Sequence, residues 1–189
     1  MSRPAERLAR YDDLFDLPEG VVGEILYGRL ITHPRPAPRH ALAAAALNDE
    51  LGPPFRRGRG GPGGWVILDE PELHLLGHIL VPDLAGWRRE RLPRLPATAW
   101  FELAPDWVCE ILSPSTAQVD RADKLPLYAE MGVAHAWLID PDARTLEVYA
   151  RQPSGRWLLL QTHKGQERVA ALPFEAVTFG LGGLWDGGG

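Results

Sequence analysis

Residues 107–112 read WVCEIL, a short apolar run that is interrupted by a single acid, Glu110. An apolar run without alternation is typical of a central strand that is covered on both faces. A glutamate in such a strand is costly unless it is paired, protonated or bound to a metal ion. From burial alone, a salt bridge to Lys124 or to an arginine explains Glu110 about as well as a metal site does.

The segments on either side of this strand predict helices. Downstream, a turn at 113–115 precedes an expected helix over 120–131 that Gly132 ends, with Pro126 near its first turn or kinking it. Upstream, HALAAAALNDEL at 40–51 is dominated by the best helix former and predicts a helix over 39–51, closed by Gly52. We therefore expect helices packed against the central strand.

The remaining apolar runs predict the rest of a sheet. Tyr27 and Gly28 stand between two short runs and indicate a hairpin over residues 23–33. Further strands are expected at 65–76 with an interruption at Pro71, at 78–86, and in an antiparallel meander at 136–139, 145–150 and 157–161. These elements predict an α/β fold with a mixed central sheet flanked by helices.

Other segments are expected to lack regular structure. Residues 56–64 read RRGRGGPGG and predict a mobile basic loop, and residues 88–98 form a polar connection. We expect a flexible start and a Gly-rich end that frays, preceded by a Leu-Trp pair that docks on the core. No linker or repeat divides residues 1–189, which predicts a single domain.

The composition limits the class of protein. The formal net charge of −5 has the wrong sign for a protein that coats nucleic acid with lysine and arginine, unless its basic residues gather on one face. The single cysteine, Cys109, cannot form an intramolecular disulfide, which favours a reducing interior. The sequence contains neither a signal-peptide pattern nor a long apolar run, so we expect a cytoplasmic protein without a membrane span.

Two acids on neighbouring strands would suit the hydrolysis of a phosphodiester. Asp83 follows Pro82 at the end of the expected strand ILVPDL, and Glu110 lies in the next expected strand. If these strands pair, both carboxylates can converge on one hard divalent cation, which prefers oxygen ligands. Taken alone, Pro-Asp is a common turn dipeptide, so Asp83 by itself favours a turn over chemistry.

Several motifs carry a resemblance to a known family. They are EILYG at 24–28, LDEPE at 68–72, VPDL at 81–84, VCEILSPST at 108–116, DRADKLPLYAEMGV at 120–133 and WLIDP at 137–141. With these motifs the chain resembles the Uma2 family over most of its length. Uma2 proteins are restriction-endonuclease-like members of the PD-(D/E)xK nuclease superfamily, so the resemblance implies that fold and a nuclease activity.

The resemblance assigns roles to individual residues. Pro82-Asp83 matches the PD element and Glu110 the D/E element, while Leu112 stands where the usual lysine would be. Lys124 on the following helix matches that lysine instead, and would orient or activate the attacking water and stabilise charge on the phosphate. Without the resemblance, an i to i+4 salt bridge with Asp120 on the helix surface would be the preferred interpretation of Lys124.

Other polar residues have two interpretations each. Glu24 matches an early acid of the family and would add a metal or water contact, or it is a solvated hairpin residue. His40 would meet substrate or act as an acid, although a lone helical histidine more often caps or packs. Glu70 and Glu72 would support the metal or form the wet face of an edge strand.

Two arginine clusters would either contact phosphates or stay solvated. They are Arg88, Arg89, Arg91 and Arg94, which follow Asp83 closely in the chain, and Arg56, Arg57 and Arg59 in the glycine-rich loop.

The sequence thus predicts an endonuclease that acts on DNA and depends on Mg²⁺ or Mn²⁺, with Asp83 and Glu110 as the metal ligands. A homodimer is a possible assembly. The alternative is a catalytically silent module of the same fold that binds DNA or a protein partner. The net acidity and the lack of a sequence-reading motif favour this alternative.

Overall fold

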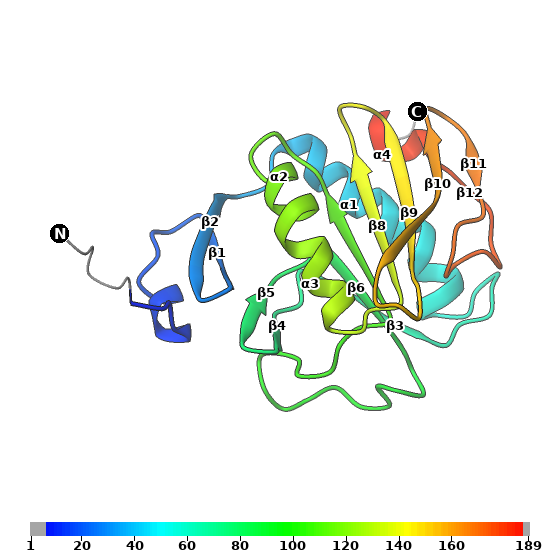
Figure 1. Ribbon diagram of the computed structural model, residues 1–189. Coiled ribbons are helices and arrows are strands. Elements are labelled where there is room, and N and C mark those ends of the chain that lie inside the picture. The colour runs from blue at the N-terminus through cyan, green and yellow to red at the C-terminus, as the bar shows by residue number, and fades with distance from the viewer. Residues whose placement is uncertain (1–6, 187–189) are drawn as a thin grey trace.

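The computed structural model describes residues 7–186, and its strands form a large sheet, a smaller sheet and a two-stranded ribbon (Figure 1). The expected flexible start and glycine-rich end, residues 1–6 and 187–189, lie outside the described residues. In spatial order the large sheet contains β10 (Trp157–Lys164), β9 (Thr145–Arg151), β8 (His135–Asp140), β7 (Trp107–Ile111), β6 (Leu84–Arg88) and β3 (Trp65–Asp69). The smaller sheet contains β2 (Arg29–Pro34), β1 (Val21–Leu26), β5 (His78–Leu80) and β4 (Leu73–Leu75), and the ribbon β11 (Arg168–Val169) and β12 (Phe179–Gly180).

The large sheet is mixed, as the sequence predicts. Strands β7 and β8 run parallel, whereas the other neighbouring pairs of the large sheet are antiparallel. The predicted meander is confirmed as β8, β9 and β10, and WVCEIL is confirmed as an interior strand whose five residues, Trp107–Ile111, are all buried.

Helices cover both faces of β7, because its side chains alternate between two cores. Cys109 belongs to the apolar cluster that contains Leu47 of α1 (Pro38–Leu51). Val108 belongs to the cluster that contains Leu127 of α3 (Leu125–Glu130). By the same alternation Glu110 shares the face of Val108, and it is therefore directed to the α3 side of the sheet.

The predicted first helix is confirmed within one residue, but Gly52 does not close it. Gly52 keeps right-handed helical dihedrals (φ −62°, ψ −52°), and the chain continues into a π-helical turn, η2 (Gly52–Arg56). The Arg57 N–H donates to the carbonyl of Gly52 at 3.1 Å, and Pro53 and Pro54, which have no N–H to donate to the last turn of α1, lie at the start of the π-helical turn. The loop that follows has no regular structure, as predicted, and it is fastened to this turn by an N–H of Arg59 that donates to Pro53 at 2.8 Å.

The second helical run begins three residues earlier than predicted. Three segments, α2 (Ala117–Val119), η3 (Asp120–Lys124) and α3, join with helical dihedrals at both junctions. Pro126 has no N–H to donate to the preceding turn, and the wider π-helical turn η3 precedes it directly. The expected kink therefore takes the form of a π-helical segment, which contains Lys124.

Two predicted strands were too long. The runs at 65–76 and 78–86 are each divided between the two sheets, with breaks next to Pro71 and Pro82. Proline cannot donate to a strand ladder, so each proline marks the place where the chain changes sheets. Asp83 consequently lies on the connection between β5 and β6, and not at the end of a strand as expected.

The hairpin and the docking of the Leu-Trp pair are confirmed. Tyr27 and Gly28 connect β1 and β2 with φ of 54° and 71°, the left-handed pair that a tight hairpin turn requires. Near the other terminus, Leu184 and Trp185 are buried in the short helix α4 (Gly182–Asp186). The remaining helical element is a 3₁₀ turn, η1 (Tyr11–Leu14). Among residues 7–186, no helix is both long and apolar enough to cross a membrane.

Candidate active site

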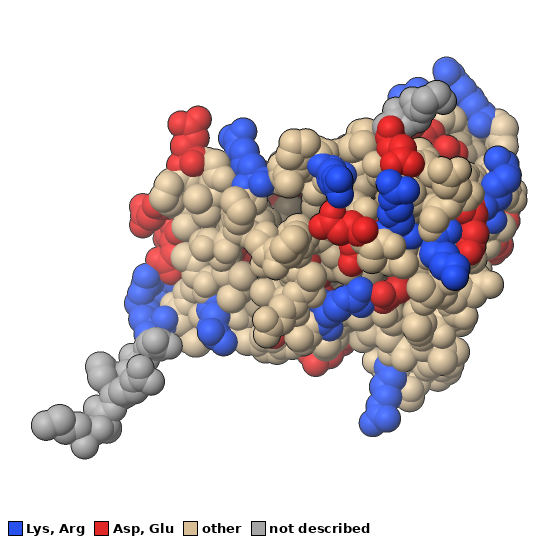
Figure 2. Space-filling model, turned by 90° about the horizontal axis from the view of Figure 1, so that it is seen from above, with Lys and Arg blue, Asp and Glu red and all other residues tan. Residues whose placement is uncertain are grey.

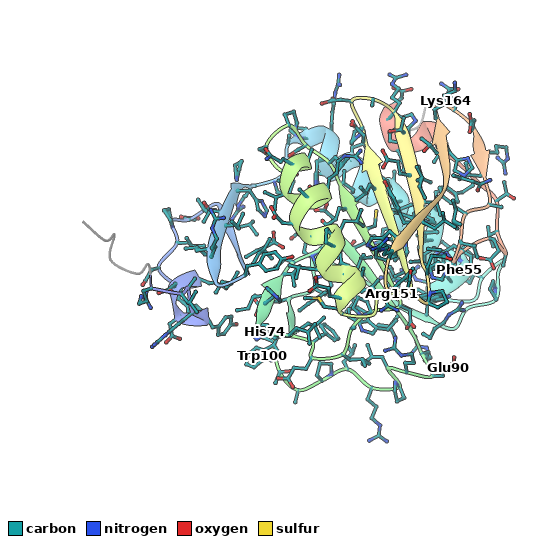
Figure 3. The ribbon with its side chains drawn as sticks, viewed as in Figure 1. Phe55, His74, Glu90, Trp100, Arg151 and Lys164 are labelled. Atoms are coloured by element: carbon teal, nitrogen blue, oxygen red, sulfur yellow. The ribbon has the colours of Figure 1, made fainter. Side chains whose placement is uncertain are left out.

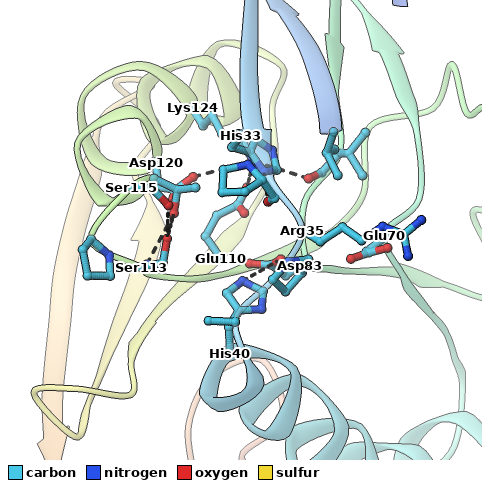
Figure 4. Close-up of a pocket in the computed structure, with 17 residues that line it drawn as sticks. His33, Arg35, His40, Glu70, Asp83, Glu110, Ser113, Ser115, Asp120 and Lys124 are labelled. Atoms are coloured by element: carbon cyan, nitrogen blue, oxygen red, sulfur yellow. Dashed lines mark hydrogen bonds and ion pairs between the residues drawn. The ribbon is translucent and has the colours of Figure 1, made fainter. Parts of the chain in front are cut away.

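The antiparallel pairing of β6 and β7 brings Asp83 next to Glu110. Leu84 is paired with Cys109, so Asp83 and Glu110 are the next two residues along the same register. The carboxylate of Asp83 is anchored there, because its Oδ2 accepts the backbone N–H of Ile111 at 2.6 Å. Both acids line one pocket, drawn in Figure 4, as the expected strand pairing requires.

Glu110 is a buried carboxylate with two polar neighbours. Its Oε1 forms an ion pair with Lys124 Nζ at 2.8 Å and accepts a hydrogen bond from the hydroxyl of Tyr128. Burial raises the pKa of Glu110 well above its ordinary value, and the positive charge of Lys124 only partly opposes that effect. The carboxylate therefore needs more positive charge than Lys124 alone supplies if it is to be ionised.

Lys124 lies inside the protein, and its interpretation as a surface partner of Asp120 is wrong. The side chain is 3% exposed, and its Nζ lies 3.0 Å from Glu24 as well as 2.8 Å from Glu110, while Asp120 is farther away at 3.7 Å. Burial by itself would lower the pKa of Lys124, but the adjacent carboxylates of Glu110 and Glu24 raise it well above the usual value. The side chain is thus held as an ammonium ion.

Glu24 reaches this cluster from the smaller sheet. It lies on β1, where its Oε1 accepts the Val81 N–H at 2.7 Å and its Oε2 lies 3.7 Å from His33 Nε2. Burial alone would raise the pKa of Glu24, but Lys124, His33 and the Val81 N–H together lower it to about 2. The solvated hairpin interpretation of Glu24 is therefore wrong: the residue is a buried anion that neutralises Lys124.

His40 and Glu70 complete the pocket beside Asp83. His40 is in the first turn of α1, and its Nε2 lies 3.0 Å from Asp83 Oδ1. Burial lowers the pKa of His40, but hydrogen bonding and charge attraction to Asp83 outweigh that effect and raise it. Glu70 lines the same pocket, whereas Glu72, which was expected beside it, is paired with His74 at 2.6 Å and does not line the pocket.

The geometry agrees with what comparison with known proteins finds. The model of the Uma2 family, described as "Putative restriction endonuclease", matches residues 8–181. The chain belongs to the Uma2 family. A crystal structure from Anabaena variabilis ATCC 29413, described as a putative nuclease belonging to DUF820, is 26% identical, with a TM-score of 0.68, and the match covers 92% of this chain and 96% of that one.

No curated protein matches the chain. The resemblance to Uma2 and the restriction-endonuclease-like fold are thus confirmed.

In this Uma2 chain the arginines after β6 are not brought to the pocket. Arg88, Arg89 and Arg91 lie at the far end of β6 from Asp83, and at about 3.3 Å per residue the strand separates the two ends by roughly 16 Å. Figure 3 labels Glu90, between Arg89 and Arg91, at the lower edge of the molecule. Arg91 is paired with Asp106 at 2.7 Å. The expectation that this cluster lies beside the site is therefore wrong.

The charges on the face seen in Figure 2 are mixed. Basic and acidic side chains are intermixed there. A protein with a negative net charge that coats nucleic acid would need one face that is mostly basic, and this face is not. Binding of a polyanion by the Uma2 chain has to rely on particular residues.

Sequence reasoning missed Tyr128, the buried hydrogen-bond donor to Glu110. Tyr128 is the i+4 neighbour of Lys124 on one helical run, as Asp120 is its i−4 neighbour. The spacing of four residues was a usable signal for Tyr128, because it places side chains on one helix face. The burial of that face was not visible, since DRADK reads as a solvated segment.

Proposed function

We propose that the protein is a metal-dependent endonuclease that hydrolyses DNA phosphodiester bonds. The observation that carries the proposal is the convergence of Asp83, Glu110 and Lys124 in one pocket of a nuclease-family fold. Two carboxylates beside an ammonium group provide what phosphodiester hydrolysis needs: ligands for a cation, and a fixed positive charge near the reacting phosphate.

Asp83 and Glu110 would hold the cation, which we expect to be Mg²⁺ or Mn²⁺. Both offer oxygen atoms, and Glu110 gains from a nearby cation because its charge is incompletely balanced. Residues 7–186 contain no cluster of three or more His, Cys, Asp or Glu side chains that could hold a metal ion. Two protein carboxylates suffice for Mg²⁺, which usually keeps several waters and also uses substrate phosphates as ligands. When bound, such an ion lowers the pKa of an attacking water and neutralises charge on the phosphate.

The protein's own groups position this chemistry. Lys124, kept charged by Glu24, would orient the attacking water and stabilise negative charge that develops on the phosphate. Its raised pKa makes it a donor and not a base. Tyr128 fixes Glu110 through a hydrogen bond, and the Ile111 N–H with His40 fixes both oxygens of Asp83. Glu24 acts through Lys124, and is therefore a positioning residue.

The second candidate function is a silent module that binds DNA or a protein partner. One observation favours it: Oε1 of Glu110 is already paired with the charge of Lys124 and accepts a hydrogen bond from Tyr128, so the cluster balances part of its charge without a metal. In that case the buried charged side chains would only stabilise the fold.

Incubation with supercoiled plasmid distinguishes the two functions. We expect nicked and linear products with Mn²⁺ or Mg²⁺, none with a chelator, and none from Asp83→Asn under any condition. Circular DNA is used because it has no ends, so product formation requires an endonuclease. Absence of products with every divalent ion tested would leave the silent module as the better account. The homodimer, the single domain and the cytoplasmic location stay predictions.

A further inference from the structure

The pocket is lined by more carboxylates than lysine and arginine side chains. Its carboxylates are those of Glu70, Asp83, Glu110 and Asp120, and its lysine and arginine side chains are Lys124 and Arg35. A DNA phosphate that enters this pocket meets negative charge, which has to be offset locally.

Arg35 is the one of these two cations that is available to a ligand. Lys124 already lies within 3.0 Å of the carboxylates of Glu24 and Glu110. Arg35 is exposed and forms no ion pair within 4.0 Å in the part of the chain that the structure describes. Its guanidinium, which cannot lose its proton in proteins, can bind two oxygens of one phosphate in parallel.

The backbone around Arg35 is stiff. Pro34 and Pro36 flank the residue, each with a fixed φ, and a residue that precedes proline is held in extended conformations. The Arg35 N–H donates to the carbonyl of Gly20 at 3.2 Å, and Ala37, also before a proline, is extended with φ −67° and ψ 158°. Little backbone freedom is therefore lost when the side chain binds a ligand.

The position of Arg35 suits a DNA strand that crosses the pocket above its carboxylates. In Figure 4 its side chain lies on the same side of the pocket as Glu70, while Ser113 and Ser115 lie on the other side and Asp83 lies between. All of these residues line the one pocket. A phosphate held by Arg35 would thus be next to the carboxylates that are proposed to carry out the chemistry.

We propose that Arg35 is the phosphate-binding residue through which the DNA backbone docks at this pocket. The proposal rests on the proposed function for the identity of the ligand as DNA. It assigns backbone contact to the proline-flanked segment between β2 and α1, and not to the arginines beyond β6. Such a contact carries no sequence information, so it would act on all DNA sequences alike.

The test is the salt dependence of DNA binding, followed by fluorescence anisotropy of a labelled short duplex. Arg35→Ala is compared with Arg35→Lys and with Arg94→Ala, which removes the same charge from an exposed arginine that lines no part of the pocket. Each titration is done in chelator and again with Ca²⁺, and the DNA is checked on a gel for cleavage. We expect Arg35→Ala to weaken binding several-fold and to reduce the slope of log affinity against log salt by about 0.9.

The two controls separate a contact from a general charge effect. Arg94→Ala should leave the slope unchanged, and Arg35→Lys should keep the slope while losing part of the affinity, because lysine retains the charge but not the paired donors. Equal slopes for Arg35→Ala and the wild type in both buffers, or no DNA binding by the wild type, would overturn the proposal. Arg35-dependent binding without plasmid cleavage would overturn the nuclease function and leave the docking residue standing.

Discussion

Nζ of Lys124 lies 2.8 Å from Oε1 of Glu110, and neither side chain is more than 4% exposed. Removal of one partner from a buried ion pair leaves the other as an uncompensated charge, which typically costs about 3–5 kcal/mol. We therefore expect Lys124→Met to lower the free energy of unfolding by several kcal/mol in the presence of chelator. Urea unfolding followed by tryptophan fluorescence measures the change.

A rescue variant shows whether the cost comes from the ion cluster. Combining Lys124→Met with Glu24→Gln and Glu110→Gln removes the two unpaired carboxylates together with the ammonium group, so the free energy of unfolding should recover in large part. The rescued protein should still fail to nick plasmid, because the proposed donor to water and phosphate and the proposed metal ligand Glu110 are both missing. A loss of only a few tenths of a kcal/mol in Lys124→Met itself would match a surface pair with Asp120, and would contradict the buried cluster.

Asp83→Asn and Glu110→Gln should each weaken the binding of Mn²⁺, because each replaces an anionic oxygen ligand with a neutral amide. Calorimetric titration gives the affinities. Glu72→Gln is the matched control, since it removes the same charge from a residue that lines no part of the pocket and is paired with His74. Unchanged Mn²⁺ affinity in both site variants would refute the metal assignment.

Glu110→Gln should also make the metal-free protein more stable at neutral pH. The folded pKa of Glu110 is raised by burial, so its ionised form is disfavoured in the folded state above the ordinary pKa of a glutamate. An amide of the same shape keeps the hydrogen-bond acceptor for Tyr128 and avoids that cost, while Lys124 stays paired with Glu24 and is not left as an uncompensated charge. Thermal melting in chelator should therefore give a higher midpoint for the variant, and a lower one would mean that the carboxylate is well compensated without metal.

Arg91→Ala should have little effect on DNA binding. Arg91 is paired with Asp106 at the end of β6 away from Asp83. The Arg91 side chain is 41% exposed, and an exposed ion pair contributes at most about 1 kcal/mol to stability. We expect a small decrease in the urea midpoint and an unchanged salt dependence of DNA affinity. A flatter salt dependence would mean that DNA also contacts this end of the sheet.

The pairing of Asp83 with Glu110 could be predicted because strands with apolar runs are visible in the sequence, and adjacent strands in a chain often pair. The burial of Lys124 could not be predicted in that way. Its helix segment, DRADK, has the composition of a solvated surface. The burial of Glu110 suggested either Lys124 or an arginine as its partner, and the family resemblance selected Lys124 as a site residue. The physical reason is that its partner Glu24 comes from the other sheet, and no local pattern reports a contact between sheets.

The course of the chain between the sheets was likewise invisible in the sequence. Pro71 and Pro82 were noted, but an interruption within a run does not show that the two halves join different sheets. For the same reason the arginines that follow Asp83 seemed close to the site. In an extended strand, residues that are neighbours in sequence can lie at opposite ends of the molecule.

Glu24 should make the protein's stability depend on acid pH. Its pKa is lowered from 4.5 to about 2 in the folded state, so its contribution to stability is fully present above pH 4.5 and is lost as the pH falls toward 2. At 1.36 kcal/mol per unit, the full contribution is roughly 3 kcal/mol. Glu24→Gln should therefore be less stable than the wild type at neutral pH, and the difference should shrink on acidification. Taking the difference between the two proteins cancels the titration of groups far from Glu24, but not that of Glu110, whose pKa the charge of Glu24 itself raises. Urea unfolding at a series of pH values measures it, and parallel curves for the two proteins would mean that Glu24 is not held ionised by Lys124.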